Sequence, residues 1–179
     1  LGVGYVNEQT IPVALLLEAL EAVARDTSKY RQAFNYGGPH GSPNLIASLR
    51  RFYIECGIGQ IPESVLDRNA FIIGPNGATS LLDALSDLLT PGAIITADPM
   101  YYIYCNTLER KGFEIIAIPE HADGIDIKAL EAAVTACSNT RKPIAFFYFV
   151  TVNNPTCTLL PNASRLRIAE LAAAYSRAQ

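Results

Sequence analysis

Short apolar segments alternate with amphipathic ones from residue 70 to the end of the chain, and this alternation is the feature that most constrains the fold. The apolar segments predict strands over residues 71–73, 93–97, 113–118 and 144–149, and the amphipathic ones predict helices over residues 79–89, 102–111, 127–136 and 163–178. A strand, a crossover helix and a second strand form a parallel pair in which the helix covers one face of the sheet. We therefore expect an α/β fold of three layers, α/β/α, around a mostly parallel sheet.

The first third of the chain lacks this alternation. Helices are predicted over residues 12–25 and 42–56, and Ser42 and Pro43 suit the N-cap and the first position of the second helix. We expect residues 1–60 to form an N-terminal arm with helices, and residues 61–179 to form the sheet domain.

The composition argues against several classes of partner. The net charge is −3, from 14 basic and 17 acidic residues without basic clusters, so nucleic acid is not an expected partner. No apolar run approaches the roughly 20 residues of a membrane span, and the N-terminal residues lack a secretory signal, so we expect a cytoplasmic protein without a membrane partner. The four cysteines form no C-x-x-C pair, which argues against a disulfide framework and against a metal site.

The most informative motif follows the very apolar run at residues 143–150, which we expect to be a parallel strand buried on both faces. The run leads into Val152-Asn153-Asn154-Pro155-Thr156. Ligands bind beyond the carboxyl ends of strands in open α/β sheets, where Asn offers both a donor and an acceptor and Pro fixes the backbone. The same residues also suit an ordinary turn, so both interpretations stay open.

A second motif lies where the strand predicted over residues 71–73 runs into a helix that starts near Gly77, Ala78 and Thr79. Small residues let the backbone approach a ligand, and the free N–H groups and dipole of a helix N-terminus stabilise an anion. This motif predicts a phosphate site, with a tight turn and an ordinary helix cap as the alternative.

A third motif follows the strand predicted over residues 93–97, where Tyr101, Tyr102 and Tyr104 succeed one another. Their rings suit a flat face for an aromatic ligand, or equally the packed side of the following helix. Both interpretations stay open for each tyrosine.

Taken in order, these motifs resemble the class I and II aminotransferases, the pyridoxal-phosphate enzymes with the aspartate aminotransferase fold. Four segments carry the resemblance: Tyr36–Gly41 followed by Leu45 and Leu49-Arg50, the Gly77-Ala78-Thr79 helix start, Asp98-Pro99-Met100-Tyr101, and Asn154-Pro155-Thr156. The resemblance covers most of the chain, from about Tyr36 to the last helix. It implies the large domain of a pyridoxal-phosphate transferase, incomplete at its C-terminus.

The resemblance also implies roles for individual residues. Residues 77–79 correspond to the loop that holds the phosphate of pyridoxal 5′-phosphate, and Tyr101 to the aromatic residue that stacks on the pyridine ring. Asn154 corresponds to the amide that binds the phenolic oxygen of the ring, and Tyr36 to a tyrosine that reaches the phosphate of the neighbouring subunit. We therefore expect a homodimer that acts on amino acid and 2-oxo acid substrates in amino-acid biosynthesis.

Two departures from the family pattern matter. The family usually has glycine at the position of Cys157, where a side chain is tolerated if the backbone φ angle is not positive. The family's Schiff-base lysine, the aspartate that pairs with the pyridine nitrogen and the arginine that binds the substrate carboxylate all lie beyond the Asn-Pro-Thr segment. We expect all three to fall outside these residues, which would leave the fragment without a catalytic residue and inactive by itself.

Three other functions stay open. The cofactor motifs also suit a lyase or cyclase resembling aminocyclopropane-carboxylate synthase. A degenerate, non-catalytic relative of the aminotransferases would keep the same motifs as scaffold. A nucleotide-binding α/β domain could use residues 77–79 for phosphate, but the chain lacks a Walker lysine and a suitably placed ribose-binding acidic residue.

Overall fold

The computed structural model describes residues 6–140 and 142–178 of the 179-residue chain. The chain divides into two compact units, Leu1–Pro75 and Asn76–Gln179. The domain boundary expected between residues 60 and 61 stays a prediction. Among the described residues, no helix is both long and apolar enough to cross a membrane.

The first unit is built from helices: η1 (Glu8–Thr10), α1 (Val13–Arg25), η2 (Arg31–Phe34), α2 (Pro43–Glu55), η3 (Ile58–Gln60) and α3 (Glu63–Leu66). Helices α1 and α2 confirm the two helices predicted in this region. The hydroxyl oxygen of Ser42 accepts the N–H of Leu45 at 3.4 Å, and Pro43 is the first residue of α2, as their positions in the sequence indicate.

The strand predicted over residues 71–73 does not form. The segment is a loop in which the N–H of Ile73 donates to the carbonyl of His40 at 2.9 Å. Gly41, with φ +102°, lies so close that an added Cβ would stand 2.6 Å from Cβ of Ile73. A strand requires a hydrogen-bonded neighbour, and none of the described strands pairs with this segment, so a short apolar run alone was insufficient evidence.

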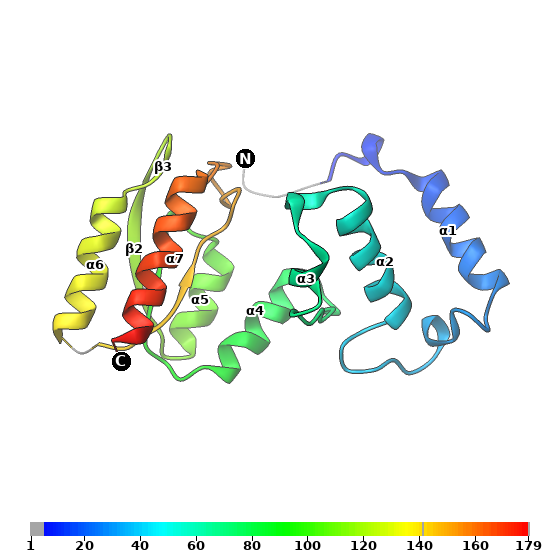
Figure 1. Cartoon of the computed structure of the whole chain (residues 1–179), viewed down its shortest axis with the longest axis horizontal. Helices are drawn as coiled ribbons and strands as arrows, with labels where there is room; N and C mark the ends of the chain where they lie inside the picture. Colours follow the sequence, from blue (N-terminus) through cyan, green and yellow to red (C-terminus); the bar gives the residue numbers. More distant parts are fainter. Residues whose placement is uncertain (1–5, 141, 179) are drawn as a thin grey trace. The chain divides into compact units, whose positions relative to one another are not determined.

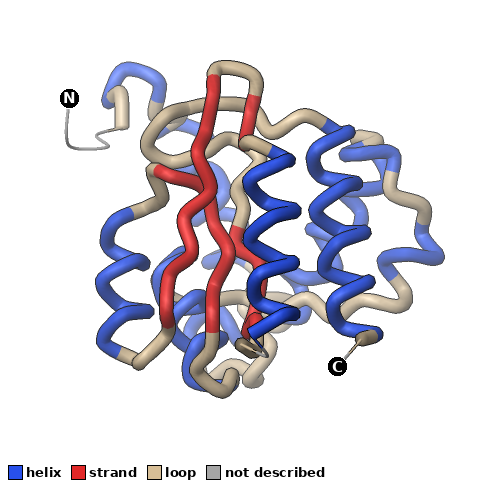
Figure 2. Tube along the Cα trace, turned by 90° about the vertical axis from the view of Figure 1, so that its left-hand side faces the viewer, coloured by secondary structure: helices blue, strands red, loops and turns tan. Residues whose placement is uncertain are grey.

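The second unit contains the sheet. Its elements are α4 (Gly77–Leu88), β1 (Ala93–Asp98), α5 (Tyr102–Arg110), β2 (Glu114–His121), β3 (Gly124–Ile125), α6 (Ile127–Thr140), β4 (Ile144–Tyr148) and α7 (Asn162–Arg177). The strand order is β3-β2-β1-β4; β1 pairs in parallel with β2 and β4, whereas β3 is antiparallel to β2 (Figure 2). The expected α/β fold with a mostly parallel sheet is confirmed, and the short β3 hairpin strand is an addition that its two residues could not signal.

Three layers result because successive residues of a strand point to opposite faces. In β1, Ile95 points into a core shared with α6 and α7, whereas its neighbour Ile94 points into a second core shared with α5. Helices α6 and α7 lie side by side on one face of the sheet, and α5 lies on the other (Figure 1). Leu82 and Leu89 pack against the α5 core and bring α4 to the same face.

Strand β4 lies at an edge of the described sheet, because it pairs only with β1 among the strands described. All five of its residues are half-buried. Phe147 packs toward α6 and α7, and Phe146 toward α5, so both faces are covered only in part. The expected parallel strand therefore forms and packs on both faces, but its residues are only half-buried, because among the described strands only β1 pairs with it.

Candidate functional site

The carboxyl ends of two strands meet at one edge of the sheet. Strands β1 and β4 are parallel neighbours, with Thr96 paired to Tyr148. Beyond β1 the chain reaches Pro99, and beyond β4 it reaches Asn153, whose side-chain nitrogen donates to the carbonyl of Pro99 at 3.0 Å. Two motifs that lie 54 residues apart in sequence are therefore adjacent.

The start of α4 lacks a side-chain cap. Its N-cap residue, Asn76, makes no side-chain hydrogen bond to the helix. The hydroxyl of Ser80 instead accepts the backbone N–H of Asn76 at 3.3 Å and donates to the carbonyl of Gly77 at 3.2 Å. The first N–H groups of a helix have no partner within it, and Gly77, Ala78 and Thr79 are exposed here. This helix start is therefore open to a ligand, as the phosphate interpretation requires.

Gly77 shapes this opening through its backbone. Its φ angle is +64°, a conformation that residues with a side chain rarely adopt. A Cβ added at Gly77 would meet nothing within 4 Å among the described residues, so the space beside the helix start is clear.

A cavity of about 270 Å³ lies between α4 and α5, and Tyr101, the residue before α5, also lines it. Thr79 and Asp83 of α4 line one side of it, and Tyr101 and Tyr104 line the other. The structure thus brings together Thr79 and Tyr101, two residues that the sequence assigned to a common site.

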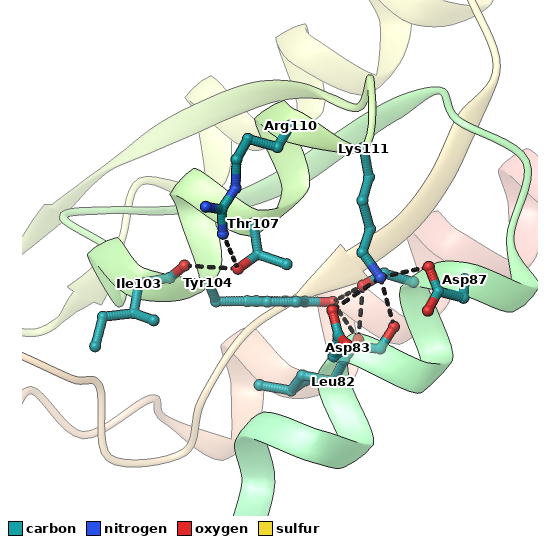
Figure 3. Close-up of polar contacts among 9 residues, drawn as sticks. Leu82, Asp83, Asp87, Ile103, Tyr104, Thr107, Arg110 and Lys111 are labelled. Atoms are coloured by element: carbon teal, nitrogen blue, oxygen red, sulfur yellow. Dashed lines mark hydrogen bonds and ion pairs between the residues drawn. The ribbon is translucent and has the colours of Figure 1, made fainter.

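Polar contacts hold the two walls of this cavity together (Figure 3). The hydroxyls of Tyr104 and Ser86 lie 2.9 Å apart in the interior. At the other end of α5, Nζ of Lys111 lies 2.9 Å from a carboxylate oxygen of Asp83 and 2.5 Å from one of Asp87. Lys111 donates hydrogen bonds to Asp87 and Asp83, and these raise the pKa of the lysine, the bond to Asp87 contributing more. The lysine therefore remains protonated and offsets the negative charge of Asp83.

The three tyrosines after β1 have three different environments. Tyr104 is a core residue, only 3% exposed, and Tyr102 is 66% exposed. Tyr101 is half-buried and lines the cavity. Core packing is therefore the observed role of Tyr104, whereas Tyr101 packs in part against the same core and also lines the cavity, so its contact with a ligand stays a prediction.

The two asparagines after β4 also differ. Asn154, the residue expected to bind the ring, is exposed. Asn153 is only 7% exposed, and its side-chain nitrogen donates to Pro99, to Glu120 and to Thr156. Sequence reasoning noted both amides but gave a role only to Asn154. A polar residue next to an apolar strand was the available signal for Asn153, yet it did not reveal which of the two amides is buried.

Cys157 closes the loop in a left-handed conformation. Its φ angle is +62°, and its N–H donates to the carbonyl of Asn153 at 2.8 Å. The condition under which a side chain would be tolerated here is therefore not met. This position favours glycine, and the cysteine carries backbone strain.

Tyr148 is a further residue at this edge that the sequence did not single out. It is the last residue of β4, and its ring centroid lies 5.0 Å from that of Tyr104. Burial raises the pKa of its hydroxyl, with smaller contributions from Tyr104 and Tyr101. All three tyrosines belong to, or pack against, the α5 core. In the sequence this tyrosine is hidden within an aromatic run that indicates only a strand.

Tyr36, the residue expected to reach the neighbouring subunit, belongs to the first unit and is 99% exposed. Across residues 6–140 and 142–178, no group of three His, Cys, Asp or Glu side chains is placed to hold a metal ion.

Comparison with known proteins gives the family. The sequence profile described as "Aminotransferase class I and II" matches residues 5–178. A comparison with curated protein sequences finds no match. Solved structures with the same fold include the kynurenine aminotransferase of Pyrococcus horikoshii, with 20% identity, a TM-score of 0.80, and coverage of 97% of this chain and 42% of that chain.

Two more solved structures have the same fold. The multiple substrate aminotransferase of Thermococcus profundus has 22% identity and a TM-score of 0.80, with coverage of 97% of this chain and 42% of that one. An archaeal alanine:glyoxylate aminotransferase has 22% identity and a TM-score of 0.74, with coverage of 98% and 44%. This chain therefore spans less than half the length of these relatives, and at such identities the likeness shows the fold alone. The profile match over nearly the whole chain confirms the resemblance found in the motifs: the chain belongs to the aminotransferase class I and II family.

Proposed function

We propose that this chain forms the cofactor-binding part of a pyridoxal-phosphate-dependent aminotransferase, which exchanges an amino group between an amino acid and a 2-oxo acid. The observation that carries the proposal is the cavity of about 270 Å³ that Thr79, at the uncapped start of α4, shares with Tyr101. The family of the chain supports the class of reaction.

The start of α4 fits a phosphate group. Its exposed backbone N–H groups at residues 77–79 and the hydroxyl of Thr79 are donors, and the helix dipole adds positive potential. The open space at Gly77 gives an anion access to the backbone. Asp83, the acidic residue in the same cavity, is paired with Lys111 and opposes the anion less than a free carboxylate would.

Two further side chains would hold an aromatic ring next to that phosphate. Tyr101 places a half-buried ring in the cavity, suited to stacking. Asn154 places an exposed amide after the buried Asn153, suited to a hydrogen bond with a ring oxygen. Related structures support this choice of ligand: the Pyrococcus horikoshii structure is in complex with PMP, and LysN of Thermus thermophilus (23% identity, TM-score 0.67) is complexed with N-(5′-phosphopyridoxyl)-L-leucine.

In this proposal, the described residues bind the cofactor and orient its ring. When bound, pyridoxal 5′-phosphate supplies a conjugated ring that accepts electrons from bonds at the α-carbon of an amino acid. The helix start anchors one end of the ligand, and Tyr101 and Asn154 fix the plane and rotation of its ring. Lys111 is not assigned as the base that moves a proton, because its contacts with Asp87 and Asp83 keep it protonated. A homodimer in the cytoplasm, acting in amino-acid biosynthesis, completes the proposal, and the exposed Tyr36 is its candidate contact with the neighbouring subunit.

The test measures binding of pyridoxal 5′-phosphate to the complete protein that contains this chain, by absorbance titration. Thr79→Val removes a hydroxyl donor next to an anion and should weaken binding about tenfold or more, since a hydrogen bond to a charged group contributes about 1.5–3 kcal/mol. Thr135→Val is the matched control, because the hydroxyl of Thr135 donates only along α6, to the carbonyl of Glu131 at 2.8 Å. A wild-type protein that binds no cofactor, or a Thr79→Val protein that binds it normally, would refute the proposal. Amino-group transfer from a panel of amino acids to 2-oxoglutarate then identifies the reaction.

A further inference from the structure

We propose that Asn153 is the positioning residue of the cofactor site, setting where Asn154 stands relative to Tyr101. The inference rests on the proposed function, because it concerns the same site. It assigns to Asn153 no contact with the cofactor or the substrate. Its role is to join the loop after β4 to the ends of β1 and β2.

The contacts of Asn153 meet at one atom. Its side-chain nitrogen lies 2.8 Å from Oε2 of Glu120, 3.0 Å from the carbonyl oxygen of Pro99 and 3.1 Å from the hydroxyl oxygen of Thr156. A backbone carbonyl can only accept a hydrogen bond, so the amide group must present its nitrogen at this point. The amide nitrogen carries two N–H groups without a charge, so its three acceptors share two hydrogens.

These contacts connect three segments of the chain. Glu120 belongs to β2, and Pro99 follows β1, two residues before Tyr101. Asn153 directly precedes Asn154. A shift of the Asn153 side chain would therefore change the separation between the amide of Asn154 and the ring of Tyr101.

The backbone of the loop reinforces this arrangement. The N–H of Asn153 donates to the carbonyl of Thr158 at 2.9 Å, and its carbonyl accepts the N–H of Cys157 at 2.8 Å. Val152 and Leu159 form an antiparallel bridge at the base of the loop. The loop is thus closed on itself, and the side chain of Asn153 is its polar attachment to the strand ends of β1 and β2. With 7% of its surface exposed, Asn153 makes these hydrogen bonds with little competition from water.

The bond to Glu120 is the strongest of the three. It is the shortest, and a carboxylate acceptor makes a hydrogen bond roughly twice as strong as a neutral one. Replacing Asn153 by aspartate would set a second carboxylate 2.8 Å from this oxygen and would also face the carbonyl of Pro99. The aspartate side chain has almost the same shape as asparagine, so the change removes the donors and leaves the packing.

The experiment compares Asn153→Asp, Glu120→Gln and the double variant in the complete protein, with Asn106→Asp on the exposed surface of α5 as the matched control. Two quantities are measured with pyridoxal 5′-phosphate as the probe: its dissociation constant, and the midpoint of the pH titration of its bound absorbance. Urea unfolding of each variant is followed in parallel.

Asn153→Asp should raise the dissociation constant at least tenfold and displace the absorbance midpoint, because the amide of Asn154 no longer meets the ring correctly. Adding Glu120→Gln should recover part of both losses, since a glutamine amide can donate to the new aspartate. Glu120→Gln alone should raise the dissociation constant about threefold, because it exchanges a charged acceptor for a neutral one. The control should match the wild type.

A purely structural role would lower the urea midpoint of Asn153→Asp while its dissociation constant and absorbance midpoint stayed at wild-type values, and this result would overturn the inference. If Asn153→Asp does not fold, Glu120→Gln decides: wild-type values for both cofactor quantities would also overturn it. Failure of the proposed function is distinct, because the wild-type protein would then bind no cofactor at all.

Discussion

The hydroxyl of Tyr175 in α7 donates a hydrogen bond to the backbone carbonyl of Lys142 at 2.8 Å, just before β4 begins. The same hydroxyl accepts the N–H of Ile144, the first residue of β4, at 3.0 Å. Tyr175 is only 8% exposed. One side chain of α7 therefore satisfies two backbone groups where the edge strand starts, on the side of β4 where none of the described strands pairs with it.

Tyr175→Phe should lower the free energy of unfolding by about 1–3 kcal/mol, since it removes the partner of a half-buried N–H and of a carbonyl while keeping the ring. Urea unfolding at equilibrium measures the loss. Tyr102→Phe is the control: that ring is 66% exposed, and its change should stay within about 0.5 kcal/mol. Equal unfolding midpoints for Tyr175→Phe and the wild type would show that the two hydrogen bonds contribute nothing.

Gly92→Ala should destabilise the sheet. An added Cβ would stand 2.6 Å from the carbonyl oxygen of Pro143, the same oxygen that accepts the N–H of Ala93 at 2.8 Å. Relief of that overlap requires β1 and β4 to separate at their first residues, with an expected loss of about 1–3 kcal/mol in unfolding free energy. Gly38→Ala, where an added Cβ meets nothing within 4 Å, should leave the midpoint almost unchanged. A stability for Gly92→Ala equal to that of Gly38→Ala would contradict this close approach.

Cys157→Gly should stabilise the protein. A left-handed residue with a side chain carries about 1–2 kcal/mol of strain, which glycine would relieve. Glycine also gives the unfolded chain more conformational freedom, and this offsets about 0.4–1 kcal/mol of the stabilisation. We expect a net increase of up to about 1 kcal/mol in the free energy of unfolding, measured in urea.

The control for this gain is a second exposed cysteine. Cys56 is the C-cap residue after α2 and has φ −91°, a conformation open to any residue, so Cys56→Gly should be destabilising. Opposite signs for the two substitutions would support the strain at Cys157. A loss of stability in both variants would mean that the loop after β4 does not hold this residue in the left-handed region.

Asp126 should make the stability of the protein depend on acid pH. Its carboxylate accepts the N–H of Ala129 at 3.0 Å at the start of α6, and this bond, with smaller effects of Lys128 and His121, lowers the pKa of the carboxyl group. A lowered pKa in the folded state stabilises the protein above the unfolded value of about 4, and this contribution disappears as pH falls through the folded value.

Asp126→Asn keeps the helix cap but cannot ionise, so it should be less stable than the wild type at pH 7, and the difference should close below about pH 4. The measurement is the difference between the urea midpoints of the two proteins, at pH 7 and again below about pH 4. At high salt the effect of His121 is screened, whereas that of the Ala129 N–H persists. A difference that stays constant from neutral to acid pH would exclude the carboxylate of Asp126 as the source.

Most helices and strands could be predicted from hydrophobic periodicity, because this periodicity depends only on which face of a segment is buried. Strand β1 and helix α6 form where apolar runs and amphipathic periods indicated them. The loop at residues 71–73 and the edge position of β4 were not predictable, because each depends on whether another strand lies alongside. Periodicity indicates which face of a segment is apolar, but it carries no information about the neighbour that pairs with it.

By itself, the sequence determined the family, the order of the helices and of the three longer strands in the second unit, and the position of residues 77–79 at a helix start, since short motifs and hydrophobic periods are properties of neighbouring residues. Only the tertiary structure decided that Tyr104 is core while Tyr101 lines a cavity, and that Asn153 is buried while Asn154 is exposed. Asn153 is buried because it meets Glu120 and Pro99, which lie 33 and 54 residues away in sequence. Contacts across such separations form only when the sheet aligns the ends of its strands, and no pattern within one segment encodes that alignment.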